Sequence, residues 1–153
     1  RPFNEVLQSG EPDFPFCLGW ANHSWEDKQF SKEGGNKLLI EQLYGGEADY
    51  TEHFMEVLKA FTDKRYIRVN DKPLFFIYAP QLIPDVTAFI QLWQKLAKEN
   101  GLPGIHFVAN AQFDHDIDPL IQKGFDAVNV VRLFHVIKKE KSLFVSKSFE
   151  LLK

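Results

Sequence analysis

The sequence has little cysteine, since Cys17 is the single one among 153 residues. One cysteine excludes an intrachain disulfide, and a chain without disulfides suits a reducing compartment. Cys17 lies within the apolar run 14–18, where a thiol behaves as a small hydrophobe. We therefore expect Cys17 to be buried and the protein to be cytoplasmic.

Long apolar runs and an excess of positive charge are also missing. No stretch approaches the roughly 20 apolar residues that cross a bilayer, and the N-terminus lacks a basic-then-apolar signal pattern. Lys and Arg number 18 against 21 Asp and Glu, which gives a net charge of −3. The tight basic cluster is confined to Lys138, Lys139 and Lys141. We expect neither a membrane span nor a nucleic-acid partner.

Several catalytic and cofactor motifs do not occur. The sequence contains no G-x-G-x-x-G, no G-x-x-x-x-G-K, no G-x-S-x-G and no H-E-x-x-H. These absences argue against dinucleotide-binding, P-loop, hydrolase-elbow and zincin chemistry, and we expect no cofactor and no metal. Asp114 and Asp116 have the spacing of a divalent-cation site, but their position just before Pro119 favours helix capping.

What is present is a regular alternation of apolar runs and amphipathic segments. Four runs resemble buried strands: 14–22, 74–79, 105–109 and 127–131. Between them, helical periodicity begins at Asp49, Pro84 and Asp118. This order predicts an α/β domain with parallel strands, right-handed crossovers and both sheet faces covered. The pattern alone fits a barrel and a doubly wound sheet equally.

The remaining segments are less regular. Residues 1–10 read as a helix ending at a glycine, without an initiator methionine, so we expect the chain to belong to something longer. Residues 23–37 have the composition of a loop, and 38–42 that of a second short strand. Beyond residue 133 the alternation of strand-like and helix-like segments weakens, and short apolar stretches lie among lysines. Residues 148–153 resemble the start of a helix.

Functional residues in parallel sheets gather where strands end. Trp20 and Asn22 lie at the end of the first run, and His23 and Trp25 come just after it. Indole faces with amides are typical of carbohydrate sites. The equally compatible alternative makes the tryptophans core residues and His23 a turn residue. The later runs end at the segments 78–80 and 110–112.

Glu41 lies at the end of the short strand 38–42, and Tyr44 follows it, just before Gly45 and Gly46. Glu41 is the best candidate catalytic residue, as an acid or base, or as a ligand for a hydroxyl pair. The glycines allow close approach of a ligand to the backbone. The alternative is a surface glutamate and a turn before the next helix.

Three blocks carry a family resemblance: 14–22, 39–46 and 65–75, extended to about residue 110. In this order they resemble the WbsX-type glycosyltransferases, a family similar to glycoside hydrolase family 99. The resemblance implies a (β/α) barrel of TIM type, present as about four strand-helix units, with residues 1–153 forming part of one domain and 134–153 a tail. It also implies sugar contacts from Trp20, Asn22, His23, Trp25, Glu41 and Tyr44.

Two departures from the family pattern limit what the resemblance implies. His23 and Ser24 stand where the family usually has Glu-Asn before the Trp, and the late Asn-Glu-Trp block with its second Glu has no counterpart up to Lys153. We expect a sugar or nucleotide-sugar substrate in lipopolysaccharide or capsular polysaccharide biosynthesis, and no activity from this chain alone. Exposed sheet edges would allow self-association. The alternatives are a non-catalytic sugar-binding or scaffold module and, more distantly, a doubly wound regulatory domain.

Overall fold

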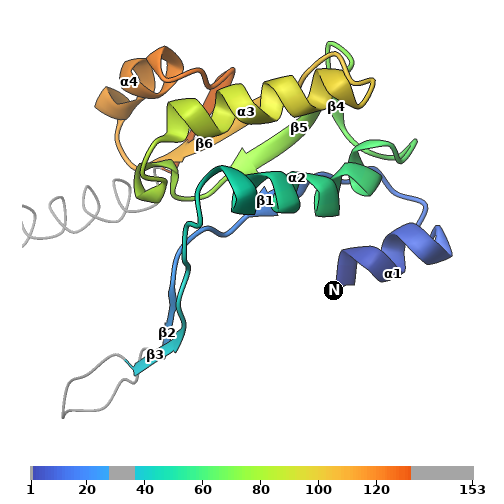
Figure 1. Cartoon of the computed structure of the whole chain (residues 1–153), viewed down its shortest axis with the longest axis horizontal. Coiled ribbons are helices and arrows are strands. Elements are labelled where there is room, and N and C mark those ends of the chain that lie inside the picture. The colour runs from blue at the N-terminus through green and yellow to red at the C-terminus, as the bar shows by residue number, and fades with distance from the viewer. Residues whose placement is uncertain (1, 28–36, 132–153) are drawn as a thin grey trace, which may run out of the picture.

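The computed structural model describes residues 2–27 and 37–131 (Figure 1). The tail expected at 134–153 lies outside these residues. In chain order the elements are α1 (Pro2–Ser9), β1 (Leu18–Trp20), β2 (Trp25–Asp27), β3 (Lys37–Ile40), α2 (Glu47–Phe61), β4 (Arg68–Val69), β5 (Lys72–Ile77), the 3-10 turn η1 (Pro80–Leu82), α3 (Val86–Glu99), β6 (His106–Ala111), the 3-10 turn η2 (Asp114–Asp116), α4 (Ile117–Gln122) and β7 (Ala127–Val130).

The main sheet confirms the predicted alternation. Its parallel strands lie in the order β1, β5, β6, β7, and α2, α3 and α4 form the successive crossovers between them. The short strand β4 adds an antiparallel partner to the start of β5. Asn70 and Asp71 make that turn with φ of 49° and 63°, a region that asparagine and aspartate tolerate better than most residues. Each strand therefore lies beside the next parallel strand along the chain.

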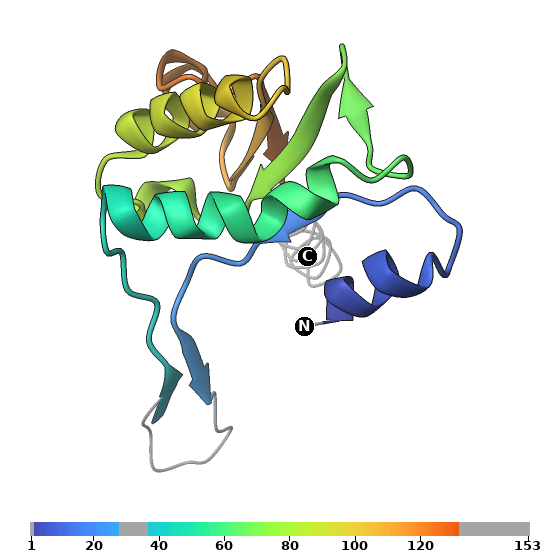
Figure 2. The same cartoon turned by 45° about the vertical axis from the view of Figure 1, so that its right-hand side comes forward.

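The helices α2 and α3 lie side by side over one face of the sheet (Figures 1 and 2). Their apolar stripes bury aromatic rings against alternate residues of β5 and β6, which leaves Phe75 and Phe107 almost without exposed surface. Trp93 at the centre contacts both rings and donates from Nε1 to the Tyr50 carbonyl at 3.0 Å. The core is thus a cluster of contacting aromatic rings, in a chain with 15 phenylalanines.

The opposite face of the sheet is not covered by a helix layer in the described part of the chain. Phe76 and Val108 on this face stay partly exposed, whereas their neighbours Phe75 and Phe107 are buried. The expectation that both faces are covered is therefore wrong for residues 2–27 and 37–131. The expectation that Cys17 is buried is also wrong, because its thiol is exposed. It alternates with Phe16 and Leu18, which pack against the core from the helix side.

The segment after β1 also differs from the prediction. β2 and β3 form a two-stranded antiparallel hairpin that projects from the body and does not join the main sheet (Figure 1). Residues 25–27, expected in a loop, are a strand, and the strand expected at 38–42 covers 37–40 with every residue exposed. An apolar segment can have the same composition in an exposed hairpin as in the main sheet, so composition alone does not predict the projecting hairpin.

The helix ends follow local chemistry. Asp85 caps α3 by accepting a hydrogen bond from the Ala88 backbone N–H at 2.9 Å. The helix ends at Glu99 and is followed by its C-cap Asn100 and by Gly101, which has a φ of 79°. Asp49 is not the cap of α2. The helix begins two residues earlier at Glu47, and the Asp49 carboxylate reaches back from the first turn to the Gly45 N–H at 3.2 Å.

Candidate functional site

The carboxyl ends of β1, β5, β6 and β7 meet along one edge of the main sheet, since these strands are parallel. In parallel sheets this edge is where ligands bind. The polar and aromatic side chains that follow these ends form the candidate site. Trp20 and His23 come from β1 and its exit, Tyr78 from the exit of β5, and Asn110 from β6.

Asn22 is completely buried at this edge and is held by several hydrogen bonds. Its Nδ2 donates to the Ala79 carbonyl at 2.7 Å and to the Tyr44 hydroxyl at 3.0 Å, while Oδ1 accepts from the Ala79 N–H at 2.7 Å. The Tyr44 hydroxyl in turn donates to the Asn22 carbonyl at 2.7 Å. Burial raises the pKa of Tyr44, against the opposing effect of the Asn22 hydrogen bond. Asn22 therefore joins three segments within the fold.

Trp20 borders the aromatic core. Its ring centroid lies 4.8 Å from His53, 5.6 Å from Phe89 and 6.0 Å from Tyr44. The side chain is half-buried. Most of the indole surface thus contacts other side chains of this chain, and the packing resembles the core alternative considered from the sequence.

His23 lies against Tyr78, with ring centroids 5.1 Å apart and an angle of 37° between the rings. Tyr78 is half exposed, and His23 is partly buried. The Nδ1 atom of His23 is buried without a hydrogen-bond partner among the residues that the structure describes. The pair joins the exit of β1 to the exit of β5 and leaves the tyrosine ring accessible.

Trp25 and Glu41 lie on the projecting hairpin. Trp25 pairs with Ile40, the residue before Glu41, and both Trp25 and Glu41 are exposed. The Gln42 backbone N–H donates to the Ser24 hydroxyl at 3.1 Å and extends the hairpin toward the body. The structure therefore separates the predicted residues into two groups. Trp20, Asn22, His23 and Tyr44 lie at the carboxyl edge of the main sheet, whereas Trp25 and Glu41 lie on the projecting hairpin.

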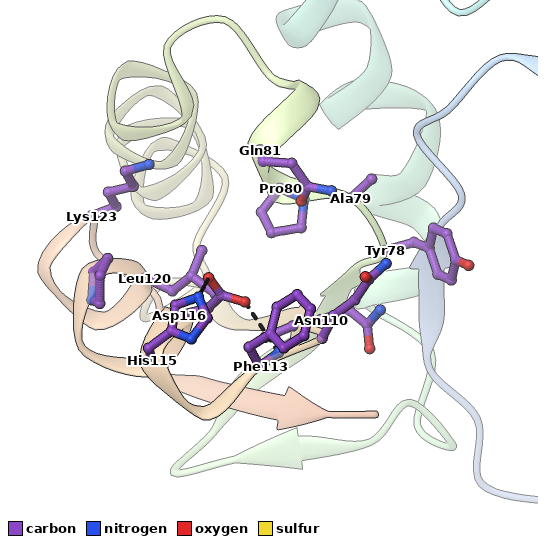
Figure 3. A pocket seen from close by; sticks show the side chains of 13 residues that line it. Tyr78, Ala79, Pro80, Gln81, Asn110, Phe113, His115, Asp116, Leu120 and Lys123 are labelled. Carbon is purple, nitrogen blue, oxygen red and sulfur yellow. Dashed lines mark hydrogen bonds and ion pairs between the residues drawn. The ribbon is translucent and has the colours of Figure 1, made fainter. Parts of the chain in front are cut away.

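A pocket of about 420 Å³ opens between the ends of β5 and β6 (Figure 3). Pro80 and Gln81 lie on one side of it, and Phe113, His115 and Asp116 lie opposite. The full lining also includes Tyr78, Ala79, Asn110, Ala111, Gln112, Pro119, Leu120 and Lys123. Of these, the segments 78–80 and 110–112 were marked as strand ends by the sequence, but the 113–116 turn was not expected to contribute.

The 113–116 turn is held by Asp116. Its Oδ2 accepts a hydrogen bond from the Phe113 N–H at 3.2 Å, and its Oδ1 lies 3.6 Å from His115 Nε2. This contact closes the turn η2, whereas the Asp116 side chain makes no capping hydrogen bond to α4, the helix that contains Pro119. The rings of Phe113 and His115 stack at 5.2 Å with an angle of 9°. Among residues 2–27 and 37–131, no three His, Cys, Asp or Glu side chains gather as metal ligands would.

Sequence comparison identifies the family. The model of the family described as Glycosyltransferase WbsX matches residues 1–151. The chain belongs to the WbsX glycosyltransferase family. The uncharacterized protein WxcX of Xanthomonas campestris pv. campestris, in strain B100 and in a second strain, is 32% identical over 113 residues, or 74% of this chain. The chain spans 16% of the length of these relatives.

Two further observations bear on this WbsX family member. No solved structure matches the chain. Within the described residues, none of the helices combines the length and the hydropathy that a membrane crossing requires.

Proposed function

We propose that this chain is part of a (β/α) barrel. The strand order β1, β5, β6, β7 follows the sequence without reversal, and α2, α3 and α4 pack on the same side. A doubly wound sheet reverses its strand order and carries helices on both faces, whereas a barrel has helices outside and side chains inside. The uncovered face with Phe76 and Val108 would then face the barrel interior, and further strands would pair with the edges of β1 and β7.

We infer that the full protein is a carbohydrate-active enzyme, a glycosyltransferase or glycosidase-like enzyme of lipopolysaccharide or capsular polysaccharide biosynthesis on the cytoplasmic side. Its substrate is a sugar or nucleotide-sugar. The observation that carries this proposal is the gathering of aromatic and amide side chains at the carboxyl edge of a parallel sheet, in a member of a glycosyltransferase family.

The predicted residues take different parts in this proposal. Trp25, His23 and Glu41 offer surface to a ligand, because none of them is fully buried. Asn22 and Tyr44 act inside the fold, since Asn22 forms hydrogen bonds with both the Ala79 backbone and the Tyr44 hydroxyl. Glu41 remains the candidate acid or base of this chain.

One observation favours a second candidate, a non-catalytic sugar-binding or scaffold module. Glycoside hydrolysis typically uses two carboxyl groups that face each other across the bond that breaks. Within residues 2–27 and 37–131, Asp116 is the one carboxylate that lines the pocket between β5 and β6, and one of its oxygens accepts a hydrogen bond from the Phe113 N–H. Catalysis of the hydrolase type would therefore need a second carboxylate from another part of the protein.

The test titrates nucleotide-sugars and mannose-type oligosaccharides into the full-length protein while following tryptophan fluorescence. We expect saturable quenching in the wild type, and loss of the quenching and of calorimetric heat in Trp25→Ala. Leu39→Ala is the matched control, because Leu39 is an exposed apolar residue of the same hairpin. Absence of sugar binding by the wild type would contradict the proposal. Binding without release of nucleotide or hydrolysis product would favour the module.

A further inference from the structure

We propose that the pocket between the ends of β5 and β6 is a subsite for one neutral pyranose unit. The inference rests on the proposed sugar-handling function and adds residues that the sequence did not single out as ligand contacts. It names the aromatic, amide and carboxylate groups that would hold the ring: Tyr78, Phe113, Asn110 and Asp116.

The pocket has a size suited to a small polar ligand. Its volume of about 420 Å³ lies within the range of small-molecule sites, roughly 300–1,000 Å³. Pro80 and Gln81 face Phe113 and Asp116 across the opening, so a flat molecule entering between them would contact both sides (Figure 3). The pocket also lies at the carboxyl edge of the sheet, where ligands bind in parallel α/β folds.

The aromatic groups offer a surface to the apolar face of a sugar ring. Phe113 keeps 44% of its surface exposed, and Tyr78 keeps 50%. Each ring contacts an imidazole: His115 stacks on Phe113, and His23 lies against Tyr78. Both aromatic residues therefore keep surface that a ligand can cover. Pyranose C–H groups are apolar on one face and would pack on such a ring.

The polar groups match a set of hydroxyls. Asn129 Nδ2 donates to Asn110 Oδ1 at 3.0 Å, which orients the Asn110 amide and leaves its NH₂ group to donate to a ligand. The Asp116 carboxylate is anchored by the Phe113 N–H and has further lone pairs for one or two hydroxyl donors. An amide donor and a carboxylate acceptor in the lining of one pocket can bind different hydroxyls of a sugar, each of which donates and accepts.

The charges of the lining indicate a neutral ligand. Among the described residues that line the pocket, Asp116 is the one carboxylate and Lys123 the one ammonium group, so these two charges offset each other. A diphosphate would need several cations or helix N-termini directed at it, as in phosphate-binding sites. We therefore assign the pocket to the sugar itself rather than to the nucleotide of a nucleotide-sugar.

The experiment measures calorimetric binding of methyl hexosides and mannose-type disaccharides, and separately of uridine and guanosine diphosphates, to the full-length protein. Phe113→Ala and Asn110→Ala should each weaken sugar binding about tenfold, the equivalent of roughly 1.4 kcal/mol, and leave nucleotide binding unchanged. Phe14→Ala is the control, because Phe14 is an exposed phenylalanine that does not line the pocket. Circular dichroism at increasing urea checks that the variants fold.

The outcomes separate this inference from the proposed function. A wild type that binds no sugar removes both. A wild type that binds sugar, with equal affinity in Phe113→Ala, Asn110→Ala and Phe14→Ala, removes the subsite alone and leaves the sugar function standing. Binding of a nucleoside diphosphate that is lost in Phe113→Ala would overturn the assignment in favour of base stacking on that ring.

Discussion

The side chain of Asn22 pairs with the backbone of Ala79 as a neighbouring strand would. It donates to the Ala79 carbonyl and accepts from the Ala79 N–H, both at 2.7 Å. The last backbone bond between the two segments runs from the Tyr78 N–H to the Trp20 carbonyl at 3.0 Å. The amide thereby continues the contact between β1 and β5 beyond their strands and fixes the chain that leads into the candidate pocket.

Asn22→Ala should destabilise the protein by about 2–4 kcal/mol. Ala79 is buried, and each buried backbone group left without a partner costs about 1–3 kcal/mol. Urea denaturation followed by circular dichroism measures the loss. Asn100→Ala is the matched control, because Asn100 Nδ2 donates to the Leu96 carbonyl at an exposed helix end. An equal change in the two variants would contradict the role given to Asn22.

Tyr66 joins the same two strands near their amino ends. Its buried hydroxyl accepts from the Leu18 N–H at 2.9 Å and donates to the Leu74 carbonyl at 2.8 Å. Burial raises the pKa of Tyr66, which keeps the hydroxyl protonated in the folded state. The β1–β5 contact is thus closed by a tyrosine at one end and an asparagine at the other.

Tyr66→Phe should cost about 1–3 kcal/mol at neutral pH, because two backbone groups lose their partner. The wild type should also lose stability as the pH rises above about 10, since the unfolded tyrosine ionises there while the folded one resists. That alkaline loss should be smaller in Tyr66→Phe. Tyr78→Phe, which removes an exposed hydroxyl, is the control for both measurements. The same alkaline slope in wild type and Tyr66→Phe would be evidence against this account.

The ion pair of Asp63 and Arg65 connects α1 to the rest of the described protein. The Arg65 guanidinium binds both carboxylate oxygens of Asp63, the nearer at 2.7 Å, and donates to the carbonyls of Val6 and Pro12. The side-chain hydrogen bond from Arg65, with a second from its backbone N–H, lowers the pKa of Asp63 to about 2. Both side chains are largely buried, at 6% and 14% exposure.

The lowered pKa predicts acid sensitivity. The contribution of Asp63 to stability is complete above its unfolded pKa of about 3.9 and is lost as the pH falls through about 2. Asp63→Asn should therefore be less stable than the wild type at pH 7 and should show a shallower loss of stability between about pH 4 and pH 2. Asp71→Asn is the control, at an exposed turn position whose φ of 63° asparagine also adopts. Equal acid slopes in Asp63→Asn and wild type would refute the prediction.

The regular elements follow from the sequence because their signals are local. The stripe from Val86 to Ala97 predicts α3, and Asp85 and Gly101 mark its ends. The four parallel strands follow from dense apolar runs between such helices. These features depend on residues a few positions apart, so no knowledge of distant contacts is needed.

The candidate site depends on contacts between distant residues. Asn22 meets Ala79 across 57 positions, and nothing near Asn22 in the sequence indicates that its amide is used within the fold. The turn at 113–116 lines the pocket and is closed by the hydrogen bond from the Phe113 N–H to Asp116. Cys17 and the hairpin were misjudged for a related reason, since an apolar run reveals neither which face of a strand is covered nor whether the strand joins the sheet.

Truncation of Trp20 should destabilise the protein, whereas truncation of Trp25 should not. Trp20→Ala should destabilise the protein by about 3 kcal/mol, because its ring contacts Tyr44, His53 and Phe89. Trp25→Ala should change stability by less than about 0.5 kcal/mol, because the side chain is 55% exposed on the hairpin. Far-UV circular dichroism must follow the unfolding, since each variant removes part of the tryptophan fluorescence.

Sugar titration of the same two variants then separates packing from binding. A folded Trp25→Ala that no longer binds sugar would place the hairpin in the binding site, because its loss has no structural cause. A stable Trp20→Ala that loses sugar binding would contradict the packing role of Trp20 and move the sugar site inward to β1. Unfolding of Trp20→Ala, with binding intact in Trp20→Phe, would mean that the ring acts through the core, since phenylalanine restores the packing without the indole N–H.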